Sequence, residues 1–265
     1  MKILKTEDGR LKADLGQFFL ENQEILQKIV DFAAVQPNEV VLEIGAGDGR
    51  LTKLLAQKAK KVIAIEIDEK FKPDLEQLPQ NVELIIGDAL EFLERKPLKK
   101  FDKIVANLPS TLVEPIFHKL TLIYFELAIF LVPEKFAYKL MSHPVLGAYF
   151  EIKLIDKVSK NSFFPVPRTN WEIISVGKVA DPLKSGKAEL FLIRYIYEHP
   201  NAKLKNSLME AVIKVSSAKG KKLTKNQARE IVAKAKIKNE LSENLPTEPS
   251  SYKIVTENLI KIISK

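Results

Sequence analysis

The sequence contains no cysteine among its 265 residues. It therefore forms no disulfide, offers no thiol nucleophile and provides no thiolate to a metal. Histidine is also scarce, and the three histidines, His118, His143 and His199, are scattered along the chain. This scatter argues against a zinc cluster, whose ligands are normally grouped at short spacings. The protein is thus not expected to be a disulfide-stapled scaffold, a thiol-dependent enzyme or a zinc protein.

Long apolar runs are missing as well. No stretch is long enough to span a bilayer, and residues 1–16 are mixed in charge without the apolar core of a signal peptide. We therefore expect a cytoplasmic protein with no membrane partner. The hydrophobic fraction of 46% is enough for a core, and the length suits one large domain or a medium domain with a small appendage.

The net charge of +8 is confined to one part of the chain. Residues 1–180 carry 25 basic and 25 acidic side chains, whereas residues 181–265 carry 17 basic and 9 acidic ones. A localised basic excess is typical of a polyanion-binding surface, most simply for nucleic acid. A lysine-rich surface that serves only solubility is the alternative at this point.

One glycine-rich stretch organises the first half of the chain. Residues 40–44 are mostly apolar and predict a buried strand, and Gly45, Gly47 and Gly49 follow at alternate positions. Glycines here would let a ligand lie against the backbone at the end of the strand. The spacing differs from the dinucleotide fingerprint. With Glu43 two residues before the first glycine, it is typical of S-adenosylmethionine-dependent methyltransferases, although an ordinary tight turn has the same appearance.

Two acidic residues end the next two predicted strands. Glu66 lies in an apolar run at 62–68, 21 residues after Gly45. At about this distance an acidic side chain meets the ribose hydroxyls of a bound nucleoside. Asp88 lies near the end of the third predicted strand, 82–89, where its carboxylate could accept the amine of the cofactor's adenine. Taken alone, Asp88 is equally well explained as a helix cap.

The fourth predicted strand, 101–106, leads into Asn107, Leu108 and Pro109. The lone pair of an aromatic amine is delocalised into the ring, so an enzyme that methylates it must localise that pair. An asparagine oxygen and a main-chain carbonyl held outward by proline supply two acceptors for the amine hydrogens. Such catalysis works by orientation and electrostatic positioning. A plain turn is the alternative reading of this tripeptide.

The remaining pattern predicts an α/β domain followed by helices. A fifth strand at 127–132 and a helix at 134–141 precede two strand-like runs at 151–158 and 171–176, which indicates a mostly parallel sheet with an antiparallel edge. Phe163 and Phe164 lie in a proline-braced loop between those runs. Beyond a linker at 181–186, helices are expected near 188–197, 204–217, 226–235 and 252–263, the third with a Thr224–Gln227 capping box.

The chain resembles the ribosomal RNA adenine N6-dimethyltransferases of the small ribosomal subunit, most like the archaeal members. The resemblance implies a class I S-adenosylmethionine-dependent methyltransferase domain with a Rossmann-like sheet over residues 1–180. It implies a small, basic, all-helical RNA-binding domain over residues 181–265. The matching motifs are Gly16-Gln17…Phe19-Leu20, Glu43-Ile44-Gly45-Ala46-Gly47-Asp48-Gly49, Glu66-Ile67-Asp68, Gly87-Asp88-Ala89, Asn107-Leu108-Pro109, Pro133-Glu134-Lys135-Phe136-Ala137 and Phe163-Phe164-Pro165-Val166-Pro167.

The same resemblance assigns roles to individual residues. The catalytic residues would be Asn107, Leu108 and Pro109. The cofactor, S-adenosyl-L-methionine, would be bound by Gln17, Phe18, Leu20, Gly45, Gly47, Glu66, Asp88, Ala89 and Asn107. The target base would stack on Phe163 and Phe164. RNA would be held by Lys221, Lys222, Lys225 and Arg229. The expected partner is ribosomal RNA in a precursor of the small subunit, bound by a monomeric protein.

The chain departs from the family mainly on the side of the target base. Ser110 stands where the family has an aromatic residue, Phe18 where it has Asn or His, and Trp171 where it has a small Ser. Stacking on an aromatic residue is worth about 1–3 kcal/mol per base. Either Phe163, Phe164 or Trp171 therefore supplies the stacking, or the substrate or activity has changed. The alternatives are a non-catalytic RNA-binding assembly factor of the same fold and a methyltransferase for another substrate.

Overall fold

The computed structural model describes residues 18–95, 100–235 and 249–263, in two compact units. Unit 1 comprises residues 1–141 and 151–178, and unit 2 comprises residues 142–150 and 179–265. Unit 2 takes in residues 142–150, which the sequence-based prediction placed with residues 1–180.

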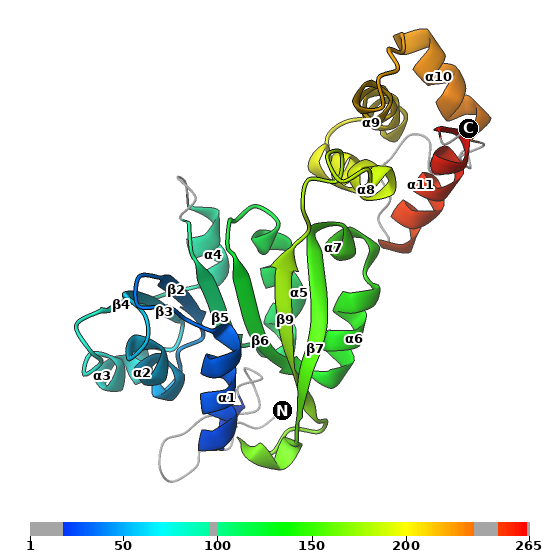
Figure 1. Cartoon of the computed structure of the whole chain (residues 1–265). Coiled ribbons are helices and arrows are strands. Elements are labelled where there is room, and N and C mark those ends of the chain that lie inside the picture. The colour runs from blue at the N-terminus through cyan, green and yellow to red at the C-terminus, as the bar shows by residue number, and fades with distance from the viewer. Residues whose placement is uncertain (1–17, 96–99, 236–248, 264–265) are drawn as a thin grey trace. The chain divides into compact units, whose positions relative to one another are not determined.

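Strands and helices alternate through unit 1 (Figure 1). The strands are β1 (Phe19–Leu20), β2 (Val40–Ile44), β3 (Lys61–Glu66), β4 (Val82–Ile86), β5 (Lys103–Asn107), β6 (Leu127–Pro133), β7 (Phe150–Val158), β8 (Phe163–Phe164) and β9 (Trp171–Lys178). The helices of this unit are α1 (Gln23–Ala33), α2 (Arg50–Ala56), α3 (Lys72–Leu75), α4 (Ala89–Glu94), α5 (Ser110–Leu120) and α6 (Glu134–Ser142), with short 3₁₀ turns η2 (Glu69–Phe71) and η3 (Lys160–Ser162).

Seven strands form one sheet in the order β4-β3-β2-β5-β6-β9-β7. The neighbours from β4 to β6 run parallel, and β9 joins β6 antiparallel. The predicted antiparallel edge is therefore present. The chain proceeds outward from β2 to β4 and then crosses back to β5 on the other side of β2. Ligands in open α/β sheets bind at such a reversal, outside the carboxyl ends of the strands.

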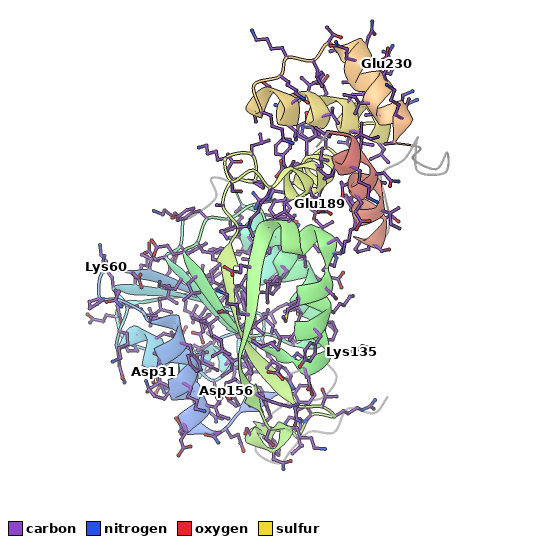
Figure 2. All side chains as sticks on the ribbon, turned by 45° about the vertical axis from the view of Figure 1, so that its right-hand side comes forward. Asp31, Lys60, Lys135, Asp156, Glu189 and Glu230 are labelled. Atoms are coloured by element: carbon purple, nitrogen blue, oxygen red, sulfur yellow. The ribbon has the colours of Figure 1, made fainter. Side chains whose placement is uncertain are left out.

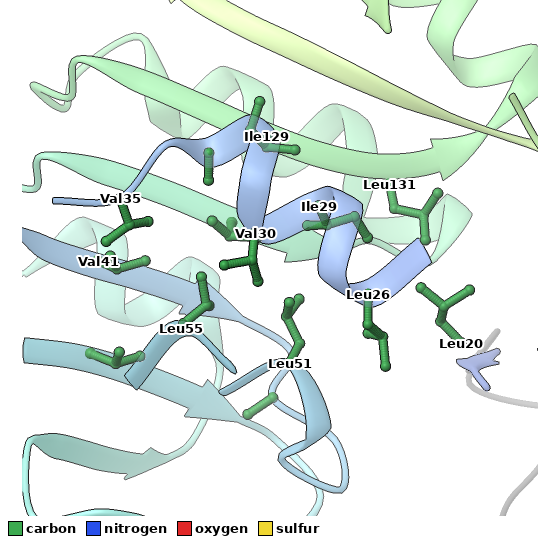
Figure 3. Packing of buried hydrophobic residues seen from close by; sticks show 14 of the residues in the cluster. Leu20, Leu26, Ile29, Val30, Val35, Val41, Leu51, Leu55, Ile129 and Leu131 are labelled. Carbon is green, nitrogen blue, oxygen red and sulfur yellow. The ribbon is translucent and has the colours of Figure 1, made fainter. Parts of the chain in front are cut away.

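Helix α1 covers one face of this sheet and fixes the first segment of the described chain. Asn22 caps it, because its side-chain oxygen accepts from the amides of Glu24 and Ile25 at 3.0 and 3.2 Å. The buried face of α1 presents Ile29 and Val30 to side chains of the neighbouring strands and of α2 (Figure 3). Burying a side chain of this size contributes about 1.5–3 kcal/mol.

Apart from Phe150, where β7 begins, the regular secondary structure of the described part of unit 2 is helical. Its helices are α7 (Pro144–Tyr149), α8 (Ala188–Glu198), α9 (Leu204–Ala218), α10 (Lys225–Lys234) and α11 (Pro249–Ile263). The capping box predicted at Thr224 is present, with both reciprocal hydrogen bonds to Gln227. Tyr149 joins the 142–150 insert to α8, since its hydroxyl donates to Glu198 Oε1 at 2.8 Å. In the described part of the chain, no helix combines the length and the apolar character that a membrane span needs.

Several charged side chains project from the surfaces of the two units. Figure 2 shows Asp31, Lys60 and Lys135 projecting from unit 1 and Glu189 and Glu230 from unit 2. Several helices of the structure have no counterpart in the sequence-based interpretation. Among them are α5, which starts directly after the Asn107 turn, and α7. Proline stands at the start of α7 and inside α5, and these prolines obscured the helical pattern.

Candidate active site

A cavity of about 260 Å³ lies in unit 1 where the parallel strands end at their carboxyl ends. Its walls come from the segment before α1, from the turns after β2, β3, β4 and β5, and from the start of β9. The lining residues are Phe18, Phe19, Leu20, Leu26, Ile29, Glu43, Ile44, Gly45, Ala46, Gly47, Asp48, Arg50, Leu51, Ile65, Glu66, Ile67, Gly87, Asp88, Ala89, Asn107, Pro109, Thr111, Leu112 and Trp171.

The glycine turn after β2 forms the floor of this cavity. Gly45 and Gly47 adopt positive φ angles of 80° and 55°, which L side chains rarely take. A Cβ atom on Gly47 would also stand 3.4 Å from the Phe19 ring. The turn is held against the neighbouring strand, because the Gly45 amide donates to the Ile65 carbonyl at 2.8 Å. The backbone is thereby left open to a ligand.

Glu66 ends β3 and is almost fully buried at the cavity. Its two carboxylate oxygens each accept a backbone amide, from Gly47 at 2.7 Å and from Asp68 at 2.9 Å. Burial raises the pKa of Glu66, and the two backbone donors oppose that rise. Each oxygen keeps a second lone pair. The side chain is thus fixed in position with acceptor capacity remaining for ligand hydroxyls.

Asp88 and Ala89 follow β4 and line the same cavity. One oxygen of Asp88 caps helix α4, accepting from the Leu90 amide at 2.7 Å. The capping role that the sequence left open is therefore real. It uses Oδ1, and a carboxylate has a second oxygen available for a ligand amine.

Asn107 is the last residue of β5 and faces the cavity with its side chain. Its amide nitrogen donates to the carbonyl oxygen of Phe18 at 2.9 Å. Its amide oxygen is buried and has no hydrogen-bond partner among the described residues. A buried acceptor without a donor costs roughly 1–3 kcal/mol. The site therefore holds one oriented acceptor that is satisfied only when a ligand supplies an N–H or O–H group.

The turn after Asn107 is held firmly. The Leu108 amide donates to the Leu131 carbonyl at 2.9 Å, and the Leu108 side chain is fully buried. Pro109 lines the cavity and stands at the N-cap of α5. Ser110 is the first residue of that helix and does not line the cavity. Because its side chain is a hydroxymethyl group, this position offers no ring on which a base near Asn107 could stack.

The three aromatic candidates for base stacking lie in different environments. Phe163 is 2% exposed and packs on Trp171 with ring centroids 4.9 Å apart, so it offers no open ring face in this conformation. Phe164 is partly exposed, but neither phenylalanine lines the cavity. Trp171 does line it and contacts Phe18 edge-on at 5.9 Å. Its indole nitrogen is buried without a partner among the described residues.

All the predicted cofactor residues in the described part of the chain line the cavity. They are Phe18, Leu20, Gly45, Gly47, Glu66, Asp88, Ala89 and Asn107. Gln17 lies outside the described residues. The predicted RNA contacts, Lys221, Lys222, Lys225 and Arg229, are all exposed in unit 2, before and along α10.

Several polar cavity residues were not assigned an individual role from the sequence, among them Arg50, Asp48 and Glu43. Arg50 pairs with Asp48 at 2.6 Å and also donates to the carbonyl of Leu20 at 3.3 Å, which ties the segment before α1 to the glycine turn. Glu43 is fully buried beneath that turn. For Glu43 a signal existed, because a carboxylate in an otherwise apolar strand is unusual.

The fold and the site together define a class I methyltransferase: a parallel sheet with its reversal beside a glycine turn, an acidic residue on the next strand and an acceptor-bearing turn after β5. Solved structures agree with this fold. The chain matches a dimethyladenosine transferase from Plasmodium falciparum with a TM-score of 0.61 and 23% identity, covering 92% of this chain and 95% of that one. It matches the 23S rRNA methyltransferase ErmE with a TM-score of 0.56 and 22% identity, over 91% and 99% of the two chains.

Sequence comparison gives the family. Residues 9–248 match the family model described as ribosomal RNA adenine dimethylase. A protein of Methanococcus maripaludis (strain C7), named "Probable ribosomal RNA small subunit methyltransferase A", is 32% identical over 92% of this chain and 96% of its own length. The ribosomal RNA small subunit methyltransferase A of Thermotoga petrophila is 33% identical over 77% and 82%. The chain belongs to the ribosomal RNA adenine dimethylase family, as its motifs predicted. It is an S-adenosylmethionine-dependent methyltransferase that acts on adenosine in ribosomal RNA.

Proposed function

We propose that this protein methylates the N6 amine of adenosines in small-subunit ribosomal RNA, with Asn107 as the residue that orients the amine. The observation that carries the proposal is the buried, unpartnered oxygen of Asn107, whose amide nitrogen is already committed to the Phe18 carbonyl. That hydrogen bond fixes which end of the amide faces the cavity. An adenine amine supplies the missing N–H donor.

The cofactor is proposed to lie over the glycine turn. Gly45 and Gly47 admit it to the backbone, Glu66 accepts its ribose hydroxyls, and Asp88 accepts its adenine amine. Leu20, Phe18 and Ala89 contribute apolar contacts at the cavity wall, and Gln17 is proposed to complete the site. When bound, S-adenosylmethionine supplies an electrophilic methyl group. Observations that support the fit are the open glycine backbone and the anchored Glu66 carboxylate with acceptor capacity to spare.

The protein's contribution to the chemistry is proposed to be positioning. The Asn107 oxygen and the Leu108 carbonyl accept the two hydrogens of the amine, which draws its lone pair out of the ring and toward the methyl donor. Pro109 keeps the turn extended, and the Leu108–Leu131 hydrogen bond holds it in place. Acceptors that are fixed in advance do not have to reorganise during the reaction.

Base stacking is the weakest part of the family pattern in this chain. We propose that Phe164, which is partly exposed, is the member of the Phe-Pro loop that can reach a base. Phe163 would serve only after it leaves its packing against Trp171. With Ser110 in place of an aromatic residue, only one face of the target base would have an aromatic side chain to stack on. The proposal therefore includes slow or incomplete transfer of a second methyl group.

Unit 2 is proposed to bind the RNA backbone through Lys221, Lys222, Lys225 and Arg229. Their exposure and the basic excess of this part of the chain support the assignment. Phosphate contacts of this kind give affinity that depends strongly on salt. We further propose that the partner is a precursor of the small ribosomal subunit, that the protein acts as a monomer and that it works in the cytoplasm.

The test is transfer of labelled methyl groups from S-adenosylmethionine to small-subunit RNA, followed by mass spectrometry of the nucleosides. We expect N6-methyladenosine, with dimethyladenosine in a smaller amount. The burial of Phe163 and the presence of Ser110 favour one second candidate, a non-catalytic assembly factor. Cofactor binding and RNA binding without any methyl transfer would support that candidate and contradict the proposal.

A further inference from the structure

Three aromatic rings follow one another along helix α8 of unit 2 and its C-cap. Phe191, Tyr195 and His199 are spaced four residues apart, so they share one stripe of the helix surface. The ring centroids of Phe191 and Tyr195 are 5.7 Å apart, and those of Tyr195 and His199 are 4.1 Å apart with their planes 20° from parallel. We call these three residues the α8 aromatic stack. Phe191 and Tyr195 are half-buried and His199 is exposed, so the stack reaches solvent at its His199 end.

The packing of unit 2 does not account for the ring at the exposed end. The residues that α8 buries are Leu192, Ile193 and Ile196, on the adjoining face of the helix. The backbone amide of His199 donates to the Ile196 carbonyl at 3.3 Å, so the helix end is closed without the imidazole. The imidazole is nevertheless fixed, because its Nδ1–H donates to the carbonyl oxygen of Tyr195 at 2.7 Å. Tyr195 covers one face of this exposed ring, and the opposite face is therefore open to a flat ligand.

Two exposed lysines lie close to the α8 aromatic stack. Nζ of Lys214, on α9, is 5.7 Å from the centroid of the Tyr195 ring. Lys203, at the N-cap of α9, directly follows the turn in which the Ala202 amide donates to the His199 carbonyl at 3.1 Å. Neither lysine has an ion-pair partner among the described residues. Both cations are therefore available to a negatively charged ligand.

The stack also adjoins the basic surface of α10. Glu210 on α9 forms an ion pair with Lys225, with 3.7 Å between Oε1 and Nζ. The same carboxylate lies near Tyr195, because burial raises the pKa of the Tyr195 hydroxyl and the negative charge of Glu210 adds to the rise. Glu210 is thus a neighbour both of the stack and of Lys225, one of the residues proposed to hold the RNA backbone. An RNA held by α10 is therefore close enough for one of its bases to reach the stack.

We propose that the α8 aromatic stack is a base-binding platform for RNA, on which an unpaired base stacks against the exposed ring of His199 while Lys203 and Lys214 bind neighbouring phosphates. Aromatic side chains beside cations hold single-stranded nucleic acid in this way, because every base has a flat face whatever its identity. In a fully paired helix the bases stack on one another instead, so the platform favours RNA with unpaired nucleotides. The proposal rests on the RNA-binding role proposed for unit 2 and not on methyl transfer.

The experiment compares the binding of two RNA probes to the full chain. One probe is a hairpin with a stem of G–C pairs and a loop of uridines around a single 2-aminopurine, and the other is a fully paired G–C duplex with the same number of phosphates. 2-Aminopurine has no 6-amino group, so the loop offers no target amine to Asn107, and its fluorescence falls when it stacks on a ring. The wild type should bind the hairpin about tenfold more tightly than the duplex, as expected for one stacked base, and should quench the fluorescence.

Three variants locate the stacked base. His199→Ala should lower the affinity for the hairpin to that for the duplex and remove the quenching, while affinity for the duplex and its salt dependence stay unchanged because no phosphate contact is lost. His199→Tyr keeps an aromatic ring and should keep the preference for the hairpin. Tyr124→Ala is the matched control in unit 1, since it removes another exposed ring that lies near a lysine, Lys100. It should leave both affinities unchanged.

Three results would overturn the proposal. The first is a wild type that binds the two probes equally, a measurement that needs no variant. The second is a preference for the hairpin that persists in His199→Ala, which would mean that the base stacks elsewhere. The third is equal weakening of both probes by His199→Ala, which would mean that the ring only supports the fold of unit 2. None of these results contradicts methyl transfer to ribosomal RNA, which is measured separately with labelled S-adenosylmethionine.

Discussion

The side-chain amide of Asn107 donates to the backbone carbonyl of Phe18, 89 residues earlier in the chain, at 2.9 Å. Phe18 in turn contacts Trp171, and Phe19 and Leu20 pair antiparallel with Phe164 and Phe163. The orientation of the proposed catalytic amide therefore depends on a segment before α1 that the Phe-Pro loop holds in place. The segment from Phe18 to Leu20 thus contacts both Asn107 at the cavity and the Phe-Pro loop.

Replacement of Asn107 should lower the rate of methyl transfer far more than the affinity for S-adenosylmethionine. Asn107→Ala removes the acceptor proposed to face the target amine, and loss of one such preorganised group typically lowers turnover by about 10²–10³. S-Adenosylmethionine should still bind, because the glycine turn, Glu66 and Asp88 are unchanged. Labelled methyl transfer and calorimetry measure the two effects separately. Asn107→Asp is the control, and it should also lose activity because its carboxylate would face the Phe18 carbonyl without a donor. Turnover at the wild-type rate in Asn107→Ala would rule out the proposed role.

Introduction of an aromatic residue at position 110 should raise activity. Ser110→Tyr places a ring at the start of α5, directly after the Asn107 turn. Restoring one stacking contact of about 1.4 kcal/mol in the transition state would raise turnover about tenfold. Ser110→Leu is the matched control, since it adds apolar volume without a ring. Mono- and dimethyladenosine are scored by mass spectrometry, with the larger gain expected in the dimethyl product. Efficient dimethylation by the wild type would show that the chain has already replaced the missing aromatic residue.

The stability of the protein should depend on the size of the side chain at position 171 more than on its indole N–H group. Trp171→Phe removes a buried N–H that has no partner in the described structure and keeps an aromatic ring, so the loss of stability should stay below about 1.5 kcal/mol. Trp171→Ala leaves a cavity beside Phe163 and should cost about 3–5 kcal/mol. Urea denaturation gives both values. Equal destabilisation by the two substitutions would mean that the indole N–H has a partner after all.

The stability of the unliganded protein should fall as the pH rises, on account of Glu43. Its folded-state pKa of about 8 lies above the unfolded value of 4.5. The folded state therefore binds the extra proton, and the contribution is fully present below pH 4.5 and is lost as the pH rises toward 8. Relative to Glu43→Gln, the wild type should lose up to about 5 kcal/mol over that range. Urea midpoints of both proteins between pH 5 and pH 9 test this, and parallel curves would contradict it.

Neutralising the basic residues near α10 should flatten the salt dependence of RNA binding. Changing Lys221, Lys222, Lys225 and Arg229 to Gln should reduce the slope of log affinity against log salt by about one for each lost phosphate contact. Weakening should be uniform across RNA sequences. A double variant, Lys60→Gln with Lys135→Gln on exposed lysines of unit 1, shows the effect on the slope of removing positive charge elsewhere on the protein. An unchanged slope in the unit 2 variant would show that this surface is solvated and does not bind phosphate.

Local sequence patterns determined most of the fold. The apolar run at Val40–Ile44 is the central strand of the sheet, because strands covered on both faces must be continuously apolar. Thr224 and Gln227 fixed the start of α10 through contacts three residues apart. The acids that end β3 and the turn that follows β5 were also recognisable from the sequence, since parallel strands bring their carboxyl ends to one edge.

Only the tertiary structure shows the hydrogen bonds and the burial of side chains whose neighbours are distant in the sequence. The sequence cannot show that the Asn107 amide nitrogen is taken by Phe18 while its oxygen is left bare, or that Phe163 is buried against Trp171. Nor can it show that Glu43 has no ion pair with Arg50, because Arg50 forms its ion pair with Asp48. Residues 142–150 joined the helices of unit 2 for the same reason. Hydrogen bonding, burial and pKa depend on which groups surround a side chain in space, and neighbours in sequence are only a few of those groups.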